Sequence, residues 1–541
     1  MSDTPQEIVR AYHARTKHRF AAYAEGPGQL DWDAQPAAFR HYAGAARCPL
    51  PLTGDHFERP WGQLNDAPAT PVAATPASLG ALLELSFGIS AWKSWGPNRW
   101  ALRCNPSSGN LHPVEAYVLS SCLPDIADGL HHYDPLDHQL EARALAQAVG
   151  QTPWLAVGLS SVMWREAWKY GERAFRYCQL DVGHAVGALA YAAALLGWTI
   201  RPQVLPGTAL AHLLGLDRPD DFPPSRFAFT ENEEAEILLA VHAPGLAAPP
   251  SGLDRWLDAA DWQGQPSRID PAPAYRWPLI DQVARASRSL RSTGETVAFP
   301  SLPPLPPHPG TAGAAALIRQ RRSGQRFDPH HRLPKAAFYR LLDATLPRPH
   351  APFTGQEAAA RIHLLLFALR VDELAPGLYL LPRTAAAAHE LDAALAPQFP
   401  GRAPVADAPA HLGLIRLAEL DLPELQRLAR ALSCHQDIAS TSAFSLGMLG
   451  EVDSTTVDGH GYRELLREAG LIGQALYLEA EAAGVRGTGI GCFFDDPVHE
   501  VCGFAGGRWQ SVYHFTVGLP ITDQRIESGP PYPQRQVELP G

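Results

Sequence analysis

Two long segments rich in alanine and leucine, residues 175–198 and 462–485, predict buried helices. Each reaches a glycine close to its end, Gly197 or Gly484, as helices closed by a C-terminal glycine do. Short apolar runs beside these helices predict strands. They cover residues 115–119 and 237–241 in the first half of the chain, and residues 362–367 and 512–517 in the second. The same order of elements therefore occurs twice.

The two halves align as an internal repeat. A shift of 287 residues superposes the two predicted helices without a gap and gives six identical pairs: Arg176/Arg463, Gly183/Gly470, Ala188/Ala475, Leu189/Leu476, Ala193/Ala480 and Gly197/Gly484. A shift of 246 residues pairs P-S-S-G (106–109) with P-F-T-G (352–355), each just before a predicted strand. Because ordered anchors at a near-constant shift indicate duplication, we predict an α+β fold built from two copies of one domain.

Residues 246–312 separate the two copies. This segment is rich in proline and includes S-L-P-P-L-P-P-H-P-G, a composition that favours extended chain over packed helices. We therefore predict one domain over residues 1–245, a proline-rich linker over 246–312 and a second domain over 313–541. Two domains of this size account for the length of 541 residues.

Composition indicates a globular, cytoplasmic protein. Apolar residues make up 46% of the chain, enough for a buried core. The net charge of −11 and the lack of a basic run argue against nucleic acid and anionic membranes as partners. The longest uncharged apolar stretch is too short for a bilayer span, and no secretory signal precedes it. Seven scattered cysteines without a C-x-x-C pair predict neither a disulfide framework nor a zinc site, and we expect no metal.

Several motifs, in order along the chain, carry a resemblance to a known family. R-R-S-G-Q-R-F (321–327), the glycine-rich end of residues 470–491 and the closing V-Y-H-F-T-V-G-L-P (512–520) resemble the FMN-dependent nitroreductase fold. R-C-N-P-S-S-G-N-L-H-P-V-E-A-Y-V-L (103–119) and K-Y-G-E-R-A-F-R-Y-C-Q-L-D-V-G-H (169–184) resemble its branch of SagB-type dehydrogenases, which form thiazoles and oxazoles. The resemblance implies two tandem nitroreductase-like domains that form an intramolecular pseudo-dimer, with FMN at their interface.

The two copies have kept different parts of the family's cofactor site. The residues that the resemblance assigns to FMN are Arg321, Ser323, Gly487, Gly489, Gly491 and Arg525 in the second copy and Arg103, Pro106, Ser107, Ser108 and Asn110 in the first. The first copy has Ile200, Pro202 and Val204 opposite the three glycines. A flavin phosphate needs guanidinium, hydroxyl or amide donors, and glycine lets backbone approach the flavin ring. Only one interface keeps both features, so we predict one FMN per chain.

Lys169 and Tyr170 are the predicted catalytic pair. In SagB-type relatives a Lys-Tyr pair at this motif is catalytic, and a lysine can remove a C–H proton when burial and nearby cations lower its pKa. Helical spacing alone, however, groups Lys169 with Glu172, Arg173 and Arg176, which is equally typical of a charged stripe in solvent. Both interpretations remain open. For His184 a hydrogen-bonded core position is favoured over catalysis, and Cys492 is either a packing residue or a flavin contact.

The leading functional hypothesis is an FMN-dependent oxidoreductase that dehydrogenates an azoline, or a similar C–N or C–C bond, in a peptide-derived substrate. A second hypothesis is an NAD(P)H-dependent reductase of nitro compounds, quinones or enones. A third is a non-catalytic, flavoprotein-like scaffold that binds a peptide or partner enzymes. Biosynthetic partner enzymes are compatible with each hypothesis. The chain is expected to be a monomer, with its pseudo-dimer inside one chain, or a homodimer.

Overall fold

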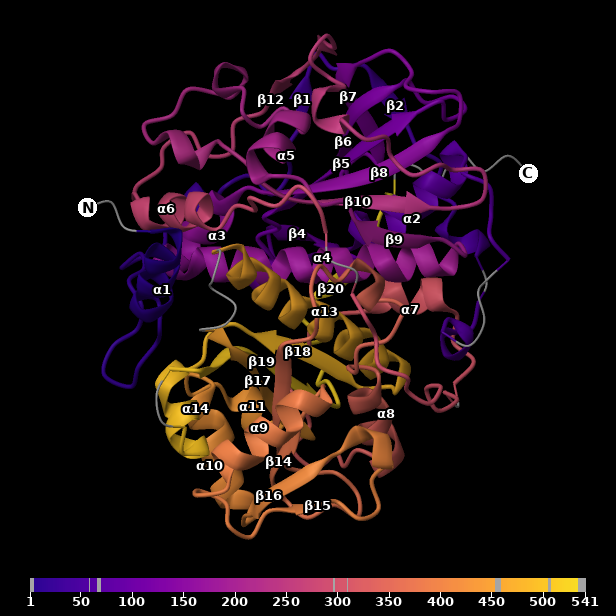
Figure 1. Cartoon of the computed structure of the whole chain (residues 1–541). Helices are drawn as coiled ribbons and strands as arrows, with labels where there is room; N and C mark the ends of the chain where they lie inside the picture. Colours follow the sequence, from indigo (N-terminus) through magenta and orange to yellow (C-terminus); the bar gives the residue numbers. More distant parts are fainter. Residues whose placement is uncertain are drawn as a thin grey trace.

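The computed structural model describes residues 4–57, 59–65, 70–294, 297–308, 310–452, 459–504 and 507–533. We call residues 4–294 the first half and residues 297–533 the second half. Each half contains one large antiparallel sheet and one long central helix. Figure 1 shows the two sheets at opposite ends of the molecule, with the two central helices between them. The predicted α+β pseudo-dimer is confirmed.

The sheet of the first half is antiparallel. Its main strands lie in the order β7 (Gln139–Leu145), β6 (Gly129–Asp134), β5 (Val114–Ser121), β8 (Trp154–Ser161), β10 (Glu234–His242) and β9 (Thr199–Pro202). Two short strands, β2 (Arg47–Pro49) and β11 (Asp261–Trp262), pair with β7 at its edge. Strands β5, β8 and β10 are buried along almost their whole length, so both faces of the sheet are covered.

The sheet of the second half repeats this order. Its strands are β15 (Ala403–Pro404), β16 (Ile415–Glu419), β14 (Gly377–Leu381), β13 (Ile362–Ala368), β17 (Phe444–Glu451), β19 (Trp509–Gly518) and β18 (Arg486–Ile490). From β16 to β18, each strand has its counterpart at the same place in the first sheet, from β7 to β9. The four strands predicted from the sequence correspond to β5, β10, β13 and β19. The duplication inferred from sequence is therefore also a duplication of topology.

The central helices are α4 (Ala174–Leu195) and α13 (His460–Ala482). They pack against each other, and the paired glycines of the repeat lie at their crossing: a Cβ atom at Gly183 would overlap the Arg467 carbonyl oxygen, and one at Gly470 would overlap that of Leu180. Gly197 and Gly484 follow the two helices with φ of 73° and 75°, the left-handed conformation that glycine adopts readily. The largest cluster of buried apolar side chains contains residues of both halves.

The remaining helices surround these sheets. In the first half they are α1 (Pro5–Arg15), α2 (Pro76–Phe87), α3 (Met163–Tyr170), α5 (Gly207–Leu213) and α6 (Pro278–Ala286). In the second half they are α7 (Ala314–Gln320), α8 (Lys335–Asp343), α9 (Ala385–Leu395), α10 (Leu422–Leu432), α11 (Asp437–Thr441) and α14 (Asp495–Cys502). No helix in these described ranges has the length and apolar character that a bilayer span requires.

The proline-rich segment 246–312 is more structured than its composition indicates. It contains β11, β12 (Gln265–Pro266), which pairs with β1 (Tyr42–Ala43), and helix α6. Ile280 and Val283 of α6 are buried, and α6 packs against α1. Proline stands at the first position of this helix, where its missing N–H costs no hydrogen bond, so local proline content did not prevent a packed helix. The domain boundaries stay a prediction.

The C-terminal part of the chain crosses to the first half. Strand β20 (Glu527–Gly529) pairs with β3 (Ile89–Trp95), which pairs with β4 (Asn98–Arg103). The buried Tyr532 hydroxyl accepts a hydrogen bond from the Ile89 N–H at 2.8 Å. The second half thus contributes a strand to a sheet of the first half.

Candidate functional site

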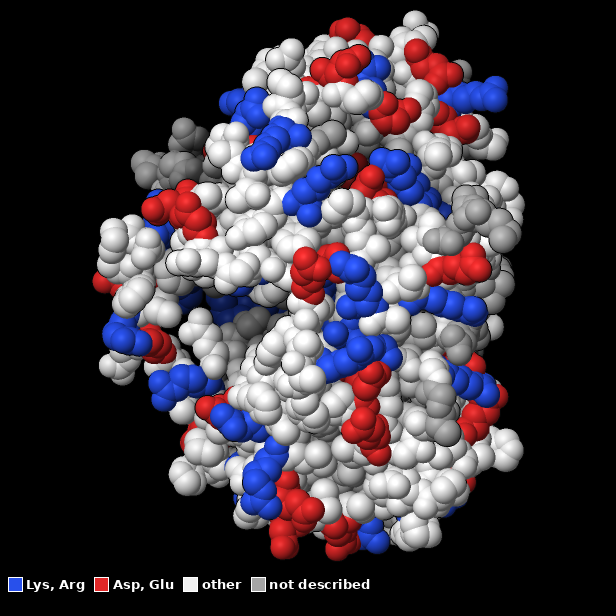
Figure 2. All heavy atoms as spheres, turned by 90° about the vertical axis from the view of Figure 1, so that its left-hand side faces the viewer, with Lys and Arg blue, Asp and Glu red and all other residues white. Residues whose placement is uncertain are grey.

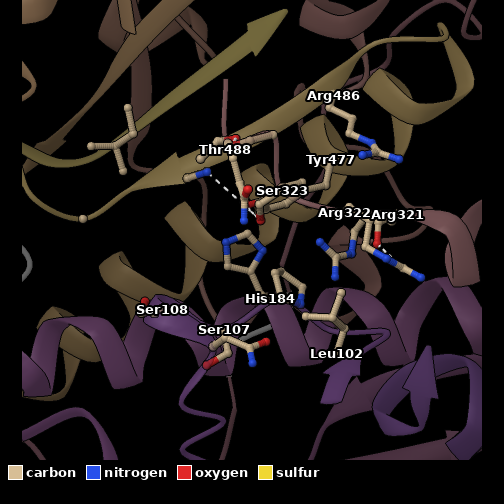
Figure 3. Close-up of a pocket in the computed structure, with 18 of the residues that line it drawn as sticks. Leu102, Ser107, Ser108, His184, Arg321, Arg322, Ser323, Tyr477, Arg486 and Thr488 are labelled. Atoms are coloured by element: carbon tan, nitrogen blue, oxygen red, sulfur yellow. Dashed lines mark hydrogen bonds between the residues drawn. The ribbon is translucent and has the colours of Figure 1, made fainter. Parts of the chain in front are cut away.

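A cavity of about 440 Å³ lies between the two halves, a size typical of small-molecule and cofactor sites. From the first half, the loop before β5 and the first turns of α4 line it. From the second half, the loop after α7, strand β18 and Tyr513 of β19 line it. In Figure 3, Arg321, Arg322 and Arg486 lie on one side of the cavity and Ser107 and Ser108 on the other, with His184 between them.

Hydrogen bonds made by its own residues hold the P-S-S-G-N loop against α4 and β4. The Ser108 backbone N–H and hydroxyl both donate to the Asp181 carboxylate of α4, the hydroxyl at 2.9 Å. The Ser107 hydroxyl accepts from the His112 N–H at 2.8 Å, and the Asn110 side-chain amide donates to the Ala101 carbonyl at 3.0 Å. These short polar side chains therefore shape the loop that forms one wall of the cavity.

Lys169 and Tyr170 are the last two residues of helix α3, and their side chains lie against this loop. A Cβ atom at Gly109, whose φ is 60°, would lie 2.5 Å from Tyr170 Oη and 3.1 Å from Lys169 Nζ. Tyr170 lines the cavity, whereas Lys169 stands behind the loop, with its ammonium 5.3 Å from the centre of the Trp32 ring. Burial lowers the pKa of Lys169, with Glu166 opposing, and burial raises the pKa of Tyr170, so its hydroxyl keeps its proton.

The charged stripe proposed around Lys169 does not face solvent. Arg173 and Arg176 are each 1% exposed, and both guanidinium groups bond Asp495 of the second half, at 3.1 and 2.7 Å. Arg173 also donates to the Gly491 carbonyl at 3.1 Å. The solvated-stripe interpretation is therefore wrong for these two arginines, because the second half covers them. Lys169 itself is half-buried.

Two buried carboxyl groups, those of Glu166 and Asp181, lie behind the loop, and sequence reasoning did not single out Glu166. Glu166 is fully buried, and both its carboxyl oxygens lack a hydrogen-bond partner among the described residues. Burial, with the nearby Asp181, raises the pKa of Glu166 well above its ordinary value. Burial also raises the pKa of Asp181 to about 7, although the Ser108 hydrogen bonds oppose this. Both acids hold protons more tightly than exposed carboxyl groups do.

The opposite side of the cavity is strongly basic. Arg321 donates to the Arg103 and Cys104 carbonyls, each at 3.1 Å, while its Nη1 is buried without a partner among the described residues. Arg322, Arg486 and Lys93 also line this side. Burial and Arg321 lower the pKa of Arg322 to about 10, and burial with Arg322 and Arg486 lowers that of Lys93. Such mutual repulsion is relieved when an anion binds.

The glycines on β18 and just after it are needed for a reason that differs from the expected one. A Cβ atom at Gly489 would overlap Tyr513, and one at Gly491 would overlap Tyr177. Gly487 lies beneath Phe515, with its Cβ position 2.6 Å from the ring, and is outside the cavity wall. Glycine therefore lets aromatic rings pack closely under the strand. The strand is the outermost of its sheet and lies along the cavity.

His184 is a hydrogen-bonded core residue that also reaches the cavity. Its Nε2 lies 3.1 Å from the Tyr513 hydroxyl and its Nδ1 3.4 Å from the Gln474 side-chain oxygen. Burial lowers the pKa of His184 to about 3, so the ring is neutral. A neutral ring held between two partners from the second half suits a fixed wall better than proton transfer at neutral pH.

Ten of the thirteen predicted site residues line the cavity: Arg103, Pro106, Ser107, Ser108, Asn110, Tyr170, Arg321, Ser323, Gly489 and Gly491. Lys169 and Gly487 lie directly behind its wall. Arg525 does not line it: its side chain is 74% exposed and bonds Asp523 at 2.7 Å. Besides Arg103 and Arg321, the cavity contains the basic side chains of Lys93, Arg322 and Arg486, which are not among the predicted site residues.

A different cluster resembles a metal site but lies elsewhere. One possible ligand atom from each of His41, Asp134 and Glu141 lies within 4.8 Å of the other two. Glu141 is already hydrogen-bonded to the His132 ring at 3.1 Å and to the Tyr42 N–H at 2.9 Å. Both contacts use Oε2, whereas Oε1 of this carboxylate is buried without a partner among the described residues.

The site that the internal repeat relates to the cavity between the halves is nearly closed. It lies where the P-F-T-G loop meets α13, and the cavities there measure about 10 and 30 Å³. A Cβ atom at Gly355 of this loop would overlap Val186 and lie 3.3 Å from Ile200. Ile200 is the residue that the repeat places opposite Gly487. The first copy thus has isoleucine where the second copy has Gly487, and this isoleucine helps to fill the second site.

The cavity is suited to FMN. A buried guanidinium nitrogen without a partner, among four basic side chains, fits a phosphate dianion. On the other side, the loop and Tyr177, Tyr477 and Tyr513 offer polar atoms and aromatic surface. Buried polar atoms of Arg103, Asn105 and His112 at the wall also lack partners in the described ranges. The donor set therefore fits an anionic, aromatic ligand.

Comparison with known proteins agrees with this fold. Residues 318–519 match the family described as the nitroreductase family. The chain matches no curated protein. A nitroreductase-type protein of Anabaena variabilis aligns with 95% of this chain and 99% of its own, at 21% identity and a TM-score of 0.66.

Two other solved structures align over parts of the chain. The Escherichia coli microcin synthetase McbBCD complex covers 47% of this chain and 84% of its own, at 15% identity and a TM-score of 0.29. A nitroreductase-type protein of Exiguobacterium sibiricum in complex with FMN covers 38% of this chain and 88% of its own, at 14% identity and a TM-score of 0.23. The family match to residues 318–519 and the fold shared with the Anabaena variabilis protein are what these comparisons show.

Proposed function

We propose that this chain is an FMN-dependent oxidoreductase that binds one FMN in the cavity between its halves. One observation carries the proposal: the loop kept only by the first copy and the basic and glycine-rich segments kept only by the second copy face each other across one cavity. The nearly closed position in the second copy supports a count of one per chain.

Arg321, Arg322, Arg486 and Lys93 would hold the phosphate. The P-S-S-G-N loop and strand β18 would hold the ring between the halves. FMN, when bound, supplies a hydride acceptor. The side chains that surround the flavin would bind and orient it, and they would exclude water.

For the substrate, we propose an azoline or a similar bond in a peptide-derived molecule. The resemblance of residues 169–184 to SagB-type dehydrogenases supports this choice. Lys169, with its lowered pKa, would accept the C–H proton, and the neutral Tyr170 hydroxyl would orient the reacting group by donating a hydrogen bond. Biosynthetic partner enzymes would supply such a substrate, and a cytoplasmic location remains part of the proposal.

Two measurements test the proposal. The visible spectrum of the purified chain, with its flavin-to-protein ratio, should show one FMN per chain; a colourless chain that ignores added FMN would support the scaffold hypothesis. Lys169→Ala and Tyr170→Phe should keep flavin but lose turnover on azoline peptides. Lys335→Ala, which changes a lysine paired with Glu373 and Asp407 at the surface, is the matched control. Rapid reduction of the flavin by NAD(P)H alone would favour the reductase hypothesis.

A further inference from the structure

Several polar side chains share one face of the hairpin formed by β6 and β7. Strand pairing puts His132 of β6 directly opposite Glu141 of β7, and paired residues lie on the same face of a sheet. Asp134 lies two residues after His132 and therefore points to that face as well. The segment that enters β1 lies against it, because the Tyr42 N–H donates to the Glu141 carboxylate at 2.9 Å. This contact brings His41 next to the two carboxylates.

His41, Asp134 and Glu141 have the spacing of metal ligands. One nitrogen or oxygen atom from each lies within 4.8 Å of the other two. His41 Nδ1 is 3.4 Å from Asp134 Oδ2. Two atoms that bind one Zn²⁺ tetrahedrally at about 2.1 Å lie about 3.4 Å apart. The first pair therefore fits already, and a short movement of the Glu141 side chain would complete the set.

Glu141 has a carboxylate oxygen that still needs a partner. Its Oε2 accepts from the Tyr42 N–H and lies 3.1 Å from the His132 ring, but its Oε1 is buried without a partner among the described residues. His132 cannot serve Oε1 as well, because its other ring nitrogen lies 3.2 Å from the Glu115 carboxylate. A buried carboxylate oxygen without a partner is costly, and a bound cation removes that cost. This observation, which is independent of the spacing, also points to a cation.

Both carboxylates are held in place, while the imidazole gives access. Asp134 accepts hydrogen bonds from the Leu136 N–H at 2.9 Å and from the Gln139 side-chain amide at 3.1 Å. Contacts of this kind orient the carboxylates of metal sites. The side chains of Asp134 and Glu141 are fully buried, whereas that of His41 is 34% exposed. A cation and a water molecule can therefore reach the cluster from the His41 side.

We propose that His41, Asp134 and Glu141 form a binding site for one divalent transition-metal cation, for which Zn²⁺ is the best match. The set offers one imidazole nitrogen and two carboxylate oxygens, which are ligands of Zn²⁺, and leaves a fourth position for water. Two carboxylates balance the charge of the cation. Bound there, the cation would tie the segment that enters β1 to the β6–β7 hairpin. None of the three residues lines the cavity between the halves, so this site is separate from the proposed flavin site.

Other carboxylates are weaker competitors for such a cation. On the face that Figure 2 shows, acidic and basic side chains are interspersed, so neighbouring positive charges oppose the binding of a cation there. No second group of three such ligands occurs within the part of the chain that the structure describes. The sequence-based expectation of no metal rested on the spacing of cysteines, whereas these three ligands come from segments that only the fold brings together.

The experiment uses the full chain after treatment with a chelator. The chain is dialysed free of the chelator and titrated with ZnCl₂ in a calorimeter, and its thermal midpoint is measured with Zn²⁺ and with Mg²⁺. We expect one tight Zn²⁺ site and a midpoint higher by a few degrees in Zn²⁺, because a ligand that binds only the folded chain stabilises it. Mg²⁺ at the same concentration should have no such effect, because it takes oxygen ligands in octahedral geometry.

Variants identify the site, since cysteines and other histidines also bind Zn²⁺. His41→Gln removes the partly exposed ligand and should weaken binding at the tight site at least about 100-fold, more than the loss of an outer hydrogen bond does. Asp134→Asn tests a second ligand and should have the same effect. His411→Gln is the matched control, because His411 is also partly exposed and bonds a buried aspartate, Asp343, at 2.9 Å, but belongs to no group of three among the described residues.

Three results would overturn the proposal. One is the lack of a tight Zn²⁺ site in the unmodified chain, and another is equal stabilisation by Mg²⁺. Neither depends on a variant, so misfolding of a variant does not hide them. The third is tight binding that both His41→Gln and Asp134→Asn retain, which would place the cation elsewhere. Failure to bind FMN would instead count only against the proposed function.

Discussion

The two sites that the internal repeat relates to each other differ: one is an open cavity, and the other is filled by side chains. Between the P-S-S-G-N loop and α4 there is a cavity of about 440 Å³, whereas the corresponding position in the second copy holds only cavities of about 10 and 30 Å³. The residues that α4 presents to the open cavity are Tyr177, Asp181 and His184. At the same places, 287 residues later, α13 carries Glu464, Glu468 and Leu471, which line the closed position. One duplicated framework thus supports two different interiors.

Buried ion pairs occupy the closed position. Arg467 donates to Gln179, Glu357 and Glu236, and Arg463 donates to Glu234, Glu236 and the Ser287 hydroxyl. Every guanidinium nitrogen of these two arginines has a partner. In the open cavity, by contrast, Arg321 keeps a buried nitrogen without one among the described residues. The difference teaches that a binding site is lost when the fold itself supplies the partners that a ligand would otherwise supply.

The repeat extends to the helices that flank these arginines. Arg176 donates to the Thr16 hydroxyl at the end of α1 at 3.0 Å, and its counterpart Arg463 donates to the Ser287 hydroxyl at the end of α6 at 2.9 Å. Helix α6 therefore plays for α13 the part that α1 plays for α4. Helix α6 lies in the segment whose composition predicted a linker.

The largest effect is expected from removing the shared acceptor of the closed position. Glu236 accepts from both Arg463 and Arg467 and is fully buried. Glu236→Gln leaves two buried guanidinium groups short of a counter-charge, which should lower the free energy of unfolding by about 3–5 kcal/mol in urea titrations. FMN per chain should stay unchanged. Glu419→Gln, at an exposed pair with Arg416, should change stability by less than about 1 kcal/mol. Equal effects of the two changes would contradict the argument.

A smaller effect is expected at the helix crossing. Gly183→Ala and Gly470→Ala each bring a Cβ atom onto a backbone carbonyl of the other central helix, Arg467 or Leu180, which cannot swing aside. Overpacking of this kind costs about 1–3 kcal/mol. Both variants should therefore shift the thermal midpoint by similar amounts, because the repeat places them equivalently. Gly401→Ala has open space around it and is the neutral control. A lower thermal midpoint for only one of these two variants would contradict the structural equivalence of the two glycines.

Two of the three arginines assigned to FMN from sequence, Arg321 and Arg525, should differ in their effect on affinity. Arg321→Lys keeps a charge but loses the planar fork, and the loss of one charge-assisted hydrogen bond corresponds to about 10- to 100-fold weaker FMN binding. Arg525→Ala removes an exposed side chain that bonds Asp523 and should change the affinity less than about twofold. Fluorescence titration of FMN with both proteins measures this contrast. A strong effect of Arg525→Ala would restore the assignment made from sequence.

The sequence predicted the duplicated elements and most of the cavity wall, because both rest on local signals. Alanine- and leucine-rich composition with a glycine near each end located α4 and α13, whereas their crossing at Gly183 and Gly470 became visible only in the structure. The basic side of the cavity was incompletely predicted, since Lys93 comes from β3, whose place beside Arg322 depends on how the two halves pack. For the same reason Arg173 and Arg176 looked like a surface stripe: helical spacing shows which residues share a face but not what covers it.

The smallest expected effect is a change of stability with pH that arises from Asp181 of helix α4. Asp181 of α4 has a pKa raised to about 7, against an ordinary 3.8, so the folded chain holds its proton at pH 6 after the unfolded chain has released it. Stability contributed by this proton is present at low pH and is lost as pH rises through 7, by about 1.4 kcal/mol between pH 6 and 8. Asp181→Asn cannot titrate, so the difference in unfolding free energy between it and the unmodified chain should change by that amount over this range. Parallel stability curves would mean that Asp181 is ionised throughout, and that the Ser108 hydrogen bonds outweigh the burial of its charge.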